Sequence, residues 1–184
     1  MKQAQAVTIW KRFHWSFFVN TQGILIALGR FREALKQGDI ESAKIELNSA
    51  ADLLRAAGAA MEMAGSFSSH EYEDEVRPTM LPPKVGVAFS GLMSWDHAVL
   101  IRIWKHLKPD FENLPPELRA EHEDFIRAYG FLASSHRAVC KRFGGNTGGS
   151  LRTENEVATA MLDRFTKSRL GMIDPGHSDG CPVQ

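Results

Sequence analysis

The stretch FLASSHRAVCKRFGGNTGGS, from Phe131 to Ser150, places a histidine in a helical pattern and then ends that pattern with paired glycines. The pattern begins well before this stretch, and one stripe recurs at steps of three and four: Leu118, His122, Phe125, Tyr129, Leu132, His136, Val139 and Phe143. This spacing is typical of an amphipathic helix whose stripe faces a core. We therefore expect His136 to face the core, whereas Arg137 falls outside the stripe.

The same helical period recurs elsewhere in the chain, in four further segments: 7–36, 40–64, 90–107 and 153–169. Pro109 is expected to end the third of these, because proline blocks helix continuation. A short helix is plausible over 71–76, and no strand pattern competes with the helices. These features predict an all-α bundle of about five helices that spans residues 1–171, followed by a flexible C-terminal tail over 172–184.

The composition argues against several classes of protein. The 184 residues fit one domain, and 22 Lys and Arg balance 22 Asp and Glu, so no basic patch suggests a nucleic-acid partner. The two cysteines, Cys140 and Cys181, are too few and too far apart for a disulfide framework or a zinc site. We see neither a signal peptide nor an apolar run of membrane-spanning length, and expect a cytoplasmic protein.

Common catalytic motifs are missing from the sequence. It holds no Glu-x-x-His pair, no His-Glu-x-x-His, no Gly-x-Ser-x-Gly and no phosphate-binding loop. Cys140, one turn after His136, could be a nucleophile, but on a core-facing helix it is more often an inert thiol. His136 itself has two interpretations: a satisfied core histidine, or an axial ligand to haem iron.

Three separated stretches resemble the haem enzymes of the tryptophan 2,3-dioxygenase and indoleamine 2,3-dioxygenase superfamily. SSHRAVCKRFGGNTGGS (134–150) resembles the proximal-histidine helix and its Gly-Thr-Gly-Gly-Ser loop. FSGLMSWDH (89–97) is similar to a Ser-Gly-x-x-Ser segment along the distal pocket, and FFVNTQ (17–22) to the N-terminal distal segment. The resemblance covers roughly residues 17–165 and implies the same helical fold.

The resemblance also implies roles for individual residues. His136 takes the place of the proximal ligand to the iron of haem b, iron protoporphyrin IX. With it we assign Ser94 and Arg137 to cofactor binding, and Thr21 and Ser90 to catalysis. The positions assigned to substrate binding are those of the glycine-rich segments: Gly91, Thr147, Gly148, Gly149 and Ser150.

Two positions depart from the superfamily's pattern. Thr21 stands where the tryptophan enzymes have a distal histidine, so a hydroxyl replaces a base there. Ala98 stands where an arginine pairs with the substrate carboxylate, and Arg77 or Arg102 could replace that arginine. Tryptophan itself is therefore not a safe prediction for the substrate.

The sequence supports three hypotheses about function. The first is a haem-dependent dioxygenase or monooxygenase that inserts oxygen from O2 into an aromatic or indole-derived small molecule. The second is a haem- or ligand-binding helical protein without turnover, and the third is a haem-free helical interaction module. A homo-oligomer is expected in each case, because five helices with this much apolar surface leave a patch for a second copy.

Overall fold

The computed structural model describes residues 3–81, 83–84, 94–143, 149–150 and 153–177. Its helices and strands are α1 (Gln3–Gln37), α2 (Ile40–Ala64), α3 (Ser69–Glu71), α4 (Trp95–Glu112), α5 (Arg119–Arg142), β1 (Gly149–Ser150), β2 (Thr153–Val157) and α6 (Ala158–Ile173). Five long helices dominate, so the predicted all-α bundle is confirmed. None of the helices in the described ranges is long and apolar enough to cross a membrane.

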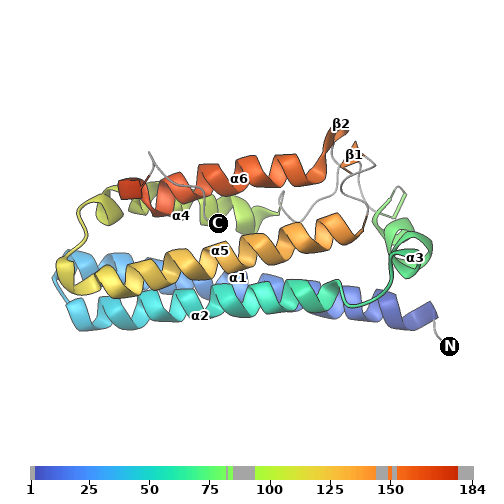
Figure 1. Cartoon of the computed structure of the whole chain (residues 1–184). Helices are drawn as coiled ribbons and strands as arrows, with labels where there is room; N and C mark the ends of the chain where they lie inside the picture. Colours follow the sequence, from blue (N-terminus) through green and yellow to red (C-terminus); the bar gives the residue numbers. More distant parts are fainter. Residues whose placement is uncertain (1–2, 82, 85–93, 144–148, 151–152, 178–184) are drawn as a thin grey trace.

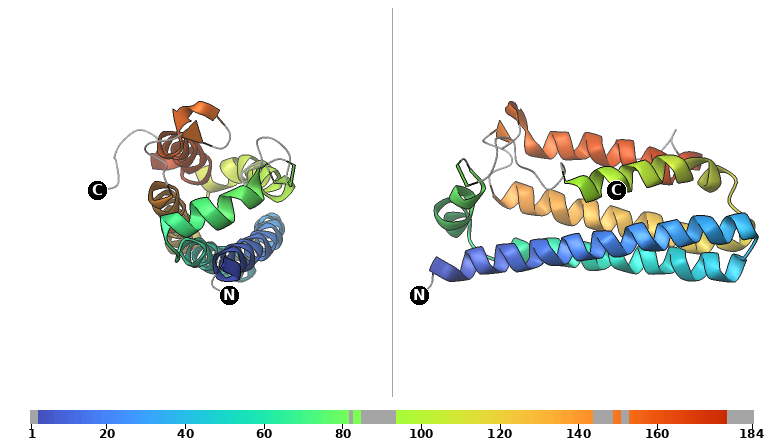
Figure 2. Two further views of the ribbon diagram at one scale, coloured as in Figure 1. Left: turned by 90° about the vertical axis from the view of Figure 1, so that its right-hand side faces the viewer. Right: turned by 180° about the vertical axis from the view of Figure 1, so that it is seen from behind.

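The five long helices form a closed ring. Each one packs mainly against two others, in the order α1, α2, α5, α6, α4 and back to α1. Figure 1 shows α1, α2 and α5 along one side of the bundle and α4 and α6 along the other. The end-on view in Figure 2 shows the helices around a common interior, with the short segment that contains α3 crossing one end.

The first two helices form a long antiparallel hairpin. Gly38 takes φ = +70° at the turn, a backbone conformation that glycine adopts without a side-chain clash. Asp39 then caps α2, because its side chain accepts a hydrogen bond from the backbone N–H of Ser42 at 3.0 Å. Both are local signals, a glycine that ends one helix and an aspartate that starts the next.

Small side chains line the buried face of α2 and let its neighbours approach closely. This face consists largely of alanines, with Leu47 and Leu54 among them. At Gly58 a Cβ atom would lie 2.7 Å from the ring of Phe131 and 3.3 Å from the Cα of Leu132 on α5. The distance between α2 and α5 therefore depends on glycine at this position.

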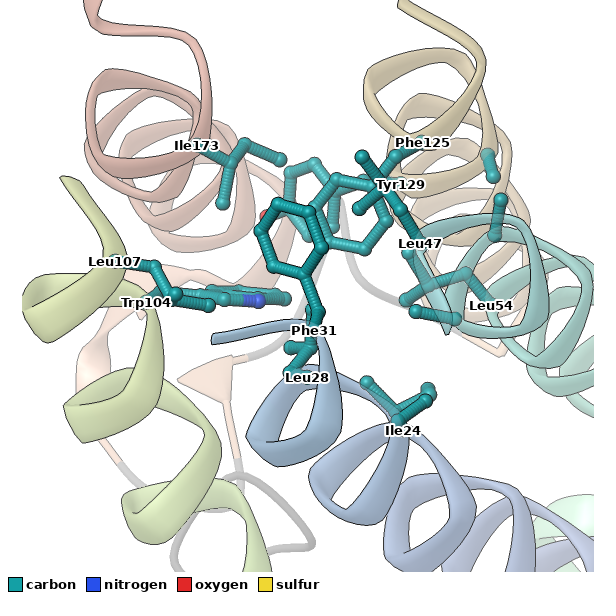
Figure 3. Packing of buried hydrophobic residues seen from close by; sticks show 14 of the residues in the cluster. Ile24, Leu28, Phe31, Leu47, Leu54, Trp104, Leu107, Phe125, Tyr129 and Ile173 are labelled. Carbon is teal, nitrogen blue, oxygen red and sulfur yellow. The ribbon is translucent and has the colours of Figure 1, made fainter. Parts of the chain in front are cut away.

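Two hydrophobic clusters fill the ring. The larger one lies among all five long helices, and Figure 3 shows ten of its labelled members: Ile24, Leu28, Phe31, Leu47, Leu54, Trp104, Leu107, Phe125, Tyr129 and Ile173. The smaller one lies near the N-terminus of α1, where the rings of Tyr72 and Phe143 stack with centroids 4.3 Å apart. Trp10 packs against both of these rings.

The boundaries of α4 differ from the prediction at both ends. Ser94 caps the helix by accepting a hydrogen bond from the N–H of His97 at 3.3 Å, so the helix begins at Trp95 rather than at residue 90. The prediction that Pro109 ends the helix is wrong, since α4 continues to Glu112. The last turn is stabilised by Phe111, which is buried and stacks on Phe31.

The region after α5 holds two short strands where the sequence predicts only a loop and a helix. Gly149–Ser150 pairs antiparallel with Thr153–Val157, and α6 begins at Ala158 instead of residue 153. At its other end α6 extends to Ile173, which is fully buried, and the His122 ring donates from Nε2 to the Ile173 carbonyl at 2.6 Å. Residues 178–184 of the expected tail lie outside the described residues.

Gly58→Ala is expected to lower the free energy of unfolding by about 1–3 kcal/mol, because the new methyl group overpacks the contact with α5. Gly29→Ala is the matched control: this helical glycine of α1 has nothing within 4 Å of its Cβ direction. It should raise stability by about 0.5–1 kcal/mol through helix propensity. Urea unfolding followed by circular dichroism measures both, and a stabilising Gly58→Ala would refute the close packing of α2 on α5.

Candidate functional site

His136 faces the interior of the ring, as its place on the stripe predicts. The pKa of His136 is lowered to about 4, mainly by burial, and the nearby His14, Arg169 and His97 act in the same direction because each would repel a protonated His136 when it is itself protonated. These three residues belong to α1, α6 and α4, so four of the five ring helices bring a basic side chain near one place. At pH 7 the His136 imidazole is neutral and offers a nitrogen lone pair.

His97, on α4, is held by Arg169 of α6. The Nη2 atom of Arg169 donates to Nε2 of His97 at 3.0 Å, and because a guanidinium can only donate, this nitrogen of His97 carries no proton. Burial lowers the pKa of His97 to about 4, and the positive charge of Arg169 acts in the same direction. His97 is thus a neutral imidazole with its proton on Nδ1.

His14 supplies a third neutral imidazole, from α1. Its Nδ1 donates to the carbonyl oxygen of Trp10 at 2.9 Å, which leaves Nε2 unprotonated. Burial lowers the pKa of His14, and the hydrogen bond to Trp10 partly opposes that shift. The ring also packs against the Trp10 indole, with centroids 3.9 Å apart.

Arg169 carries a positive charge into the same region. Its guanidinium lies 4.9 Å from the centre of the Phe165 ring and hydrogen-bonds the Tyr129 hydroxyl. No carboxylate pairs with it in the part of the chain that the structure describes, and its buried Nε has no hydrogen-bond partner there. Burial lowers the pKa of Arg169, and Tyr129 partly compensates.

The walls near this cluster are aromatic. Trp104, two turns after His97, is buried and meets Tyr129 edge to face, with ring centroids 5.3 Å apart. The Trp104 indole Nε1 is buried without a partner among the described residues. Burial raises the pKa of the Cys140 thiol to about 11, so Cys140 stays protonated at neutral pH and the nucleophile interpretation loses support.

Some of the predicted site residues lie on this cluster and others do not. Thr21 is buried two turns after His14 on the same face of α1, and its hydroxyl donates to the Phe17 carbonyl at 2.9 Å. Ser94 adjoins His97 as the cap of α4. Arg137 instead points outward and forms an exposed ion pair with Asp163, at 2.7 Å.

The glycine-rich positions assigned to substrate are only partly covered by the structure. Ser90, Gly91, Thr147 and Gly148 lie outside the described residues. Gly149 and Ser150 form β1, which lies at the end of the bundle where α3 crosses (Figure 1). Their assignment therefore stays a prediction.

The two arginines that the sequence analysis offered for a substrate carboxylate lie away from the histidines. Arg77 bonds Glu73, and Arg102 lies over the exposed Trp95 ring, so both are engaged at the surface. Arg169 is the arginine that faces the histidines, and the sequence interpretation missed it together with His14 and His97. The sequence did hold a signal for both histidines. His14 lies seven residues before the buried Thr21, and His97 lies seven residues before the buried Trp104. Seven residues are two helical turns, so each histidine lies on the same helix face as a buried residue.

The cluster is not a protein-only metal site. Over the described ranges, no three His, Cys, Asp or Glu side chains lie close enough to hold a metal ion together. Neutral imidazoles among aromatic walls do suit a group that brings its own equatorial ligands and needs only axial ones, as haem does. The buried Arg169 cation would suit the carboxylates that such a group carries.

Comparison with known proteins gives one family. The family of SfmD 3-methyl-L-tyrosine peroxygenase matches residues 1–121, about two thirds of the chain, and this span includes His14, Thr21 and His97. The chain belongs to this family. The match is to these peroxygenases, and the finer resemblance to the tryptophan and indoleamine dioxygenases is not shown by it. The expectation of kinship with oxidative enzymes is confirmed.

One curated relative extends the match to the rest of the site. The 3-methyl-L-tyrosine peroxygenase of Streptomyces lavendulae is 29% identical over 182 residues, which cover 96% of this chain and 50% of the relative. The chain thus spans about half the length of that relative. No solved structure matches the chain.

Acidification is expected to destabilise the fold between pH 6.5 and about 4. His97 and His136 have pKa values of about 4 when folded, below the ordinary 6.5, so the unfolded chain binds more protons in this window. Their contribution to stability is complete above pH 6.5 and is lost as the pH falls toward 4.

Urea unfolding across this pH range tests the effect. His136→Gln removes one proton-uptake site and should reduce the slope of stability against pH by up to about 1.4 kcal/mol per pH unit. A variant with the same slope as the unmodified chain would show that His136 is not desolvated.

Proposed function

We propose that this chain is a haem-dependent peroxygenase that places one oxygen atom on the ring of a small aromatic substrate. The observation that carries the proposal is the convergence of His14, His97 and His136, all neutral, beside the Arg169 cation inside the ring. Membership of the peroxygenase family supports the reaction class. In such a reaction an aromatic C–H and a peroxide give a C–OH and water.

We propose different roles for the histidines: one binds the haem iron and another acts as a base. His136 is proposed as the axial ligand, since it is the most desolvated of the three and sits on the stripe of α5. His97 is the second candidate, although its Nε2 is engaged by Arg169. The bound haem would supply the redox chemistry of oxygen transfer.

His14 is the side chain best placed to handle a proton. Its Nε2 is unprotonated, because Nδ1 donates to Trp10, and its lowered pKa keeps it in the base form at neutral pH. We propose that His14 Nε2 takes a proton from peroxide and returns it to the departing water. Thr21 and Ser90 stay proposed as catalytic hydroxyls; the Thr21 hydrogen is committed to Phe17, so its oxygen acts as an acceptor.

Peroxide is proposed as the oxygen donor because the family is one of peroxygenases, whereas the motif resemblance points to O2. The aromatic amino acid named for the relative sets the proposed substrate class: an aromatic amino acid of about the size of tyrosine. Trp104 and Tyr129 would orient its ring and exclude water. The loop positions Thr147, Gly148, Gly149 and Ser150, with Gly91, remain proposed substrate contacts.

The chain is expected to take up haemin and to show a Soret band that shifts on reduction and with carbon monoxide. His136→Gly should lose this spectrum, and added imidazole should restore it by filling the vacated axial place. His106→Gly, at an exposed position of α4, is the control and should leave the spectrum unchanged.

If the Soret band is the same in His136→Gly and in His106→Gly as in the unmodified chain, the ligand assignment is overturned. Acid–acetone extraction tests the haem b prediction separately, since haem b leaves the denatured chain. Haem that stays on the chain would instead indicate a covalent link, with Cys140 one turn from His136 as the nearest cysteine along α5.

The haem-loaded chain is expected to convert L-tyrosine or 3-methyl-L-tyrosine into a product that carries one additional oxygen from 18O-labelled hydrogen peroxide. His14→Gln should slow this step by about 100-fold, the usual range for loss of a general base, while haem binding persists. Mass spectrometry reads the label. Label from 18O2 instead would favour the dioxygen alternative, and no product with either donor would favour haem binding without turnover.

A further inference from the structure

Arg169 is a half-buried cation whose Nε is buried without a hydrogen-bond partner among the described residues. Its Nη2 donates to neutral His97, and its other recorded partner is the Tyr129 hydroxyl. Burial raises the pKa of Tyr129, so the phenol stays neutral and cannot balance the charge. An uncompensated charge and an unpaired buried N–H each cost free energy on folding, which is why such groups are normally paired.

Two acids on helices of the ring already have partners. Asp163, six residues before Arg169 on α6, pairs with the exposed Arg137 at 2.7 Å. Glu62 of α2 accepts a hydrogen bond from Ser135 at 2.8 Å. Among the side chains that the structure describes, no carboxylate forms an ion pair with Arg169.

The free part of the guanidinium has a characteristic geometry. The unpartnered Nε shares the side edge of the guanidinium with Nη2, which has a second N–H besides the one that it donates to His97. Through such an edge arginine can bind both oxygens of a carboxylate in parallel hydrogen bonds. This edge is buried, and the guanidinium plane is held by the Phe165 ring, 4.9 Å from its centre. A guanidinium edge held in one orientation matches the two oxygens of a carboxylate, which the single ammonium group of a lysine cannot do.

We propose that Arg169 binds a carboxylate inside the ring, next to His97 and His136. The carboxylate can come from the α-carboxyl group of an amino-acid substrate or from a propionate of haem, and both sources rest on the function proposed above. Arg169 would thus perform the task of the arginine that is replaced by Ala98. It would do so from α6, on the opposite side of the interior from α1.

Two matched ligand pairs distinguish the sources. L-tyrosine and tyramine differ only in the carboxylate, and their affinities are measured by calorimetry with the haem-free chain and again with the haem-loaded chain. Haemin and haemin dimethyl ester differ in free propionates, and their affinities are measured by Soret titration. Hydrogen bonds to charged groups lead us to expect a preference of about 10- to 100-fold for the carboxylate-bearing member of at least one pair.

Arg169→Met should abolish that preference, and Arg169→Lys should retain part of it because the charge remains without the fork. Arg102→Met is the control, since Arg102 lies on the surface over Trp95, and it should keep the full preference. Circular dichroism reports whether each variant folds. If Arg169→Met does not fold, a reduced preference in Arg169→Lys decides the question.

Two results would overturn the proposal: an unmodified chain that shows no preference in either pair, or Arg169 variants that keep it. Failure of the proposed function would give results different from failure of the carboxylate site. A chain that takes up no haemin but still prefers L-tyrosine to tyramine would retain the carboxylate site without peroxygenase chemistry. A haem-loaded chain that oxidises L-tyrosine and tyramine alike, and that binds haemin and its dimethyl ester alike, would retain the chemistry without the carboxylate site.

Discussion

The hydrogen bond from Arg169 to His97 joins α6 to α4, and it brings a half-buried positive charge next to a histidine. The surrounding histidines respond by staying neutral: burial and the nearby charge lower the pKa of both His97 and His136 to about 4. Neutral imidazoles are the form that binds iron and accepts protons. The buried cation thus prepares the histidines for the chemistry proposed here, and it leaves one hydrogen-bonding edge for a ligand.

This arrangement depends on the close packing of α2 against its two neighbours in the ring, α1 and α5. The small residues of α2 let α1 and α5 pack closely against it, and at Gly58 there is no room for a Cβ beside Phe131. That packing sets His14 and His136 at the same level of the bundle, near the aromatic end formed by Trp10, Tyr72 and Phe143. The other end is filled by aromatic and aliphatic side chains around Phe31 and Trp104 (Figure 3). The polar cluster lies between these two apolar regions.

Much of the site could be anticipated from local patterns, and the remainder could not. His136 was predicted to face inward because a stripe of eight positions fixes the orientation of α5. Arg169 gave no such signal, since an arginine in an amphipathic helix is ordinarily solvated, and its burial depends on α4 and α5 lying across from it. The predicted stop at Pro109 failed for a related reason: the burial of Phe111 stabilises a turn that local propensity disfavours.

The sequence by itself determined the number of long helices, the cap of α2 at Asp39 and the inward orientation of His136, because hydrophobic period and capping are properties of neighbouring residues. Only the tertiary structure decided that His14, His97 and Arg169 lie near enough to His136 to lower its pKa. These residues come from four helices, and His14 and Arg169 lie at opposite ends of the chain. Their meeting depends on the order in which the helices close the ring, which is set by packing across the whole bundle and by no local pattern.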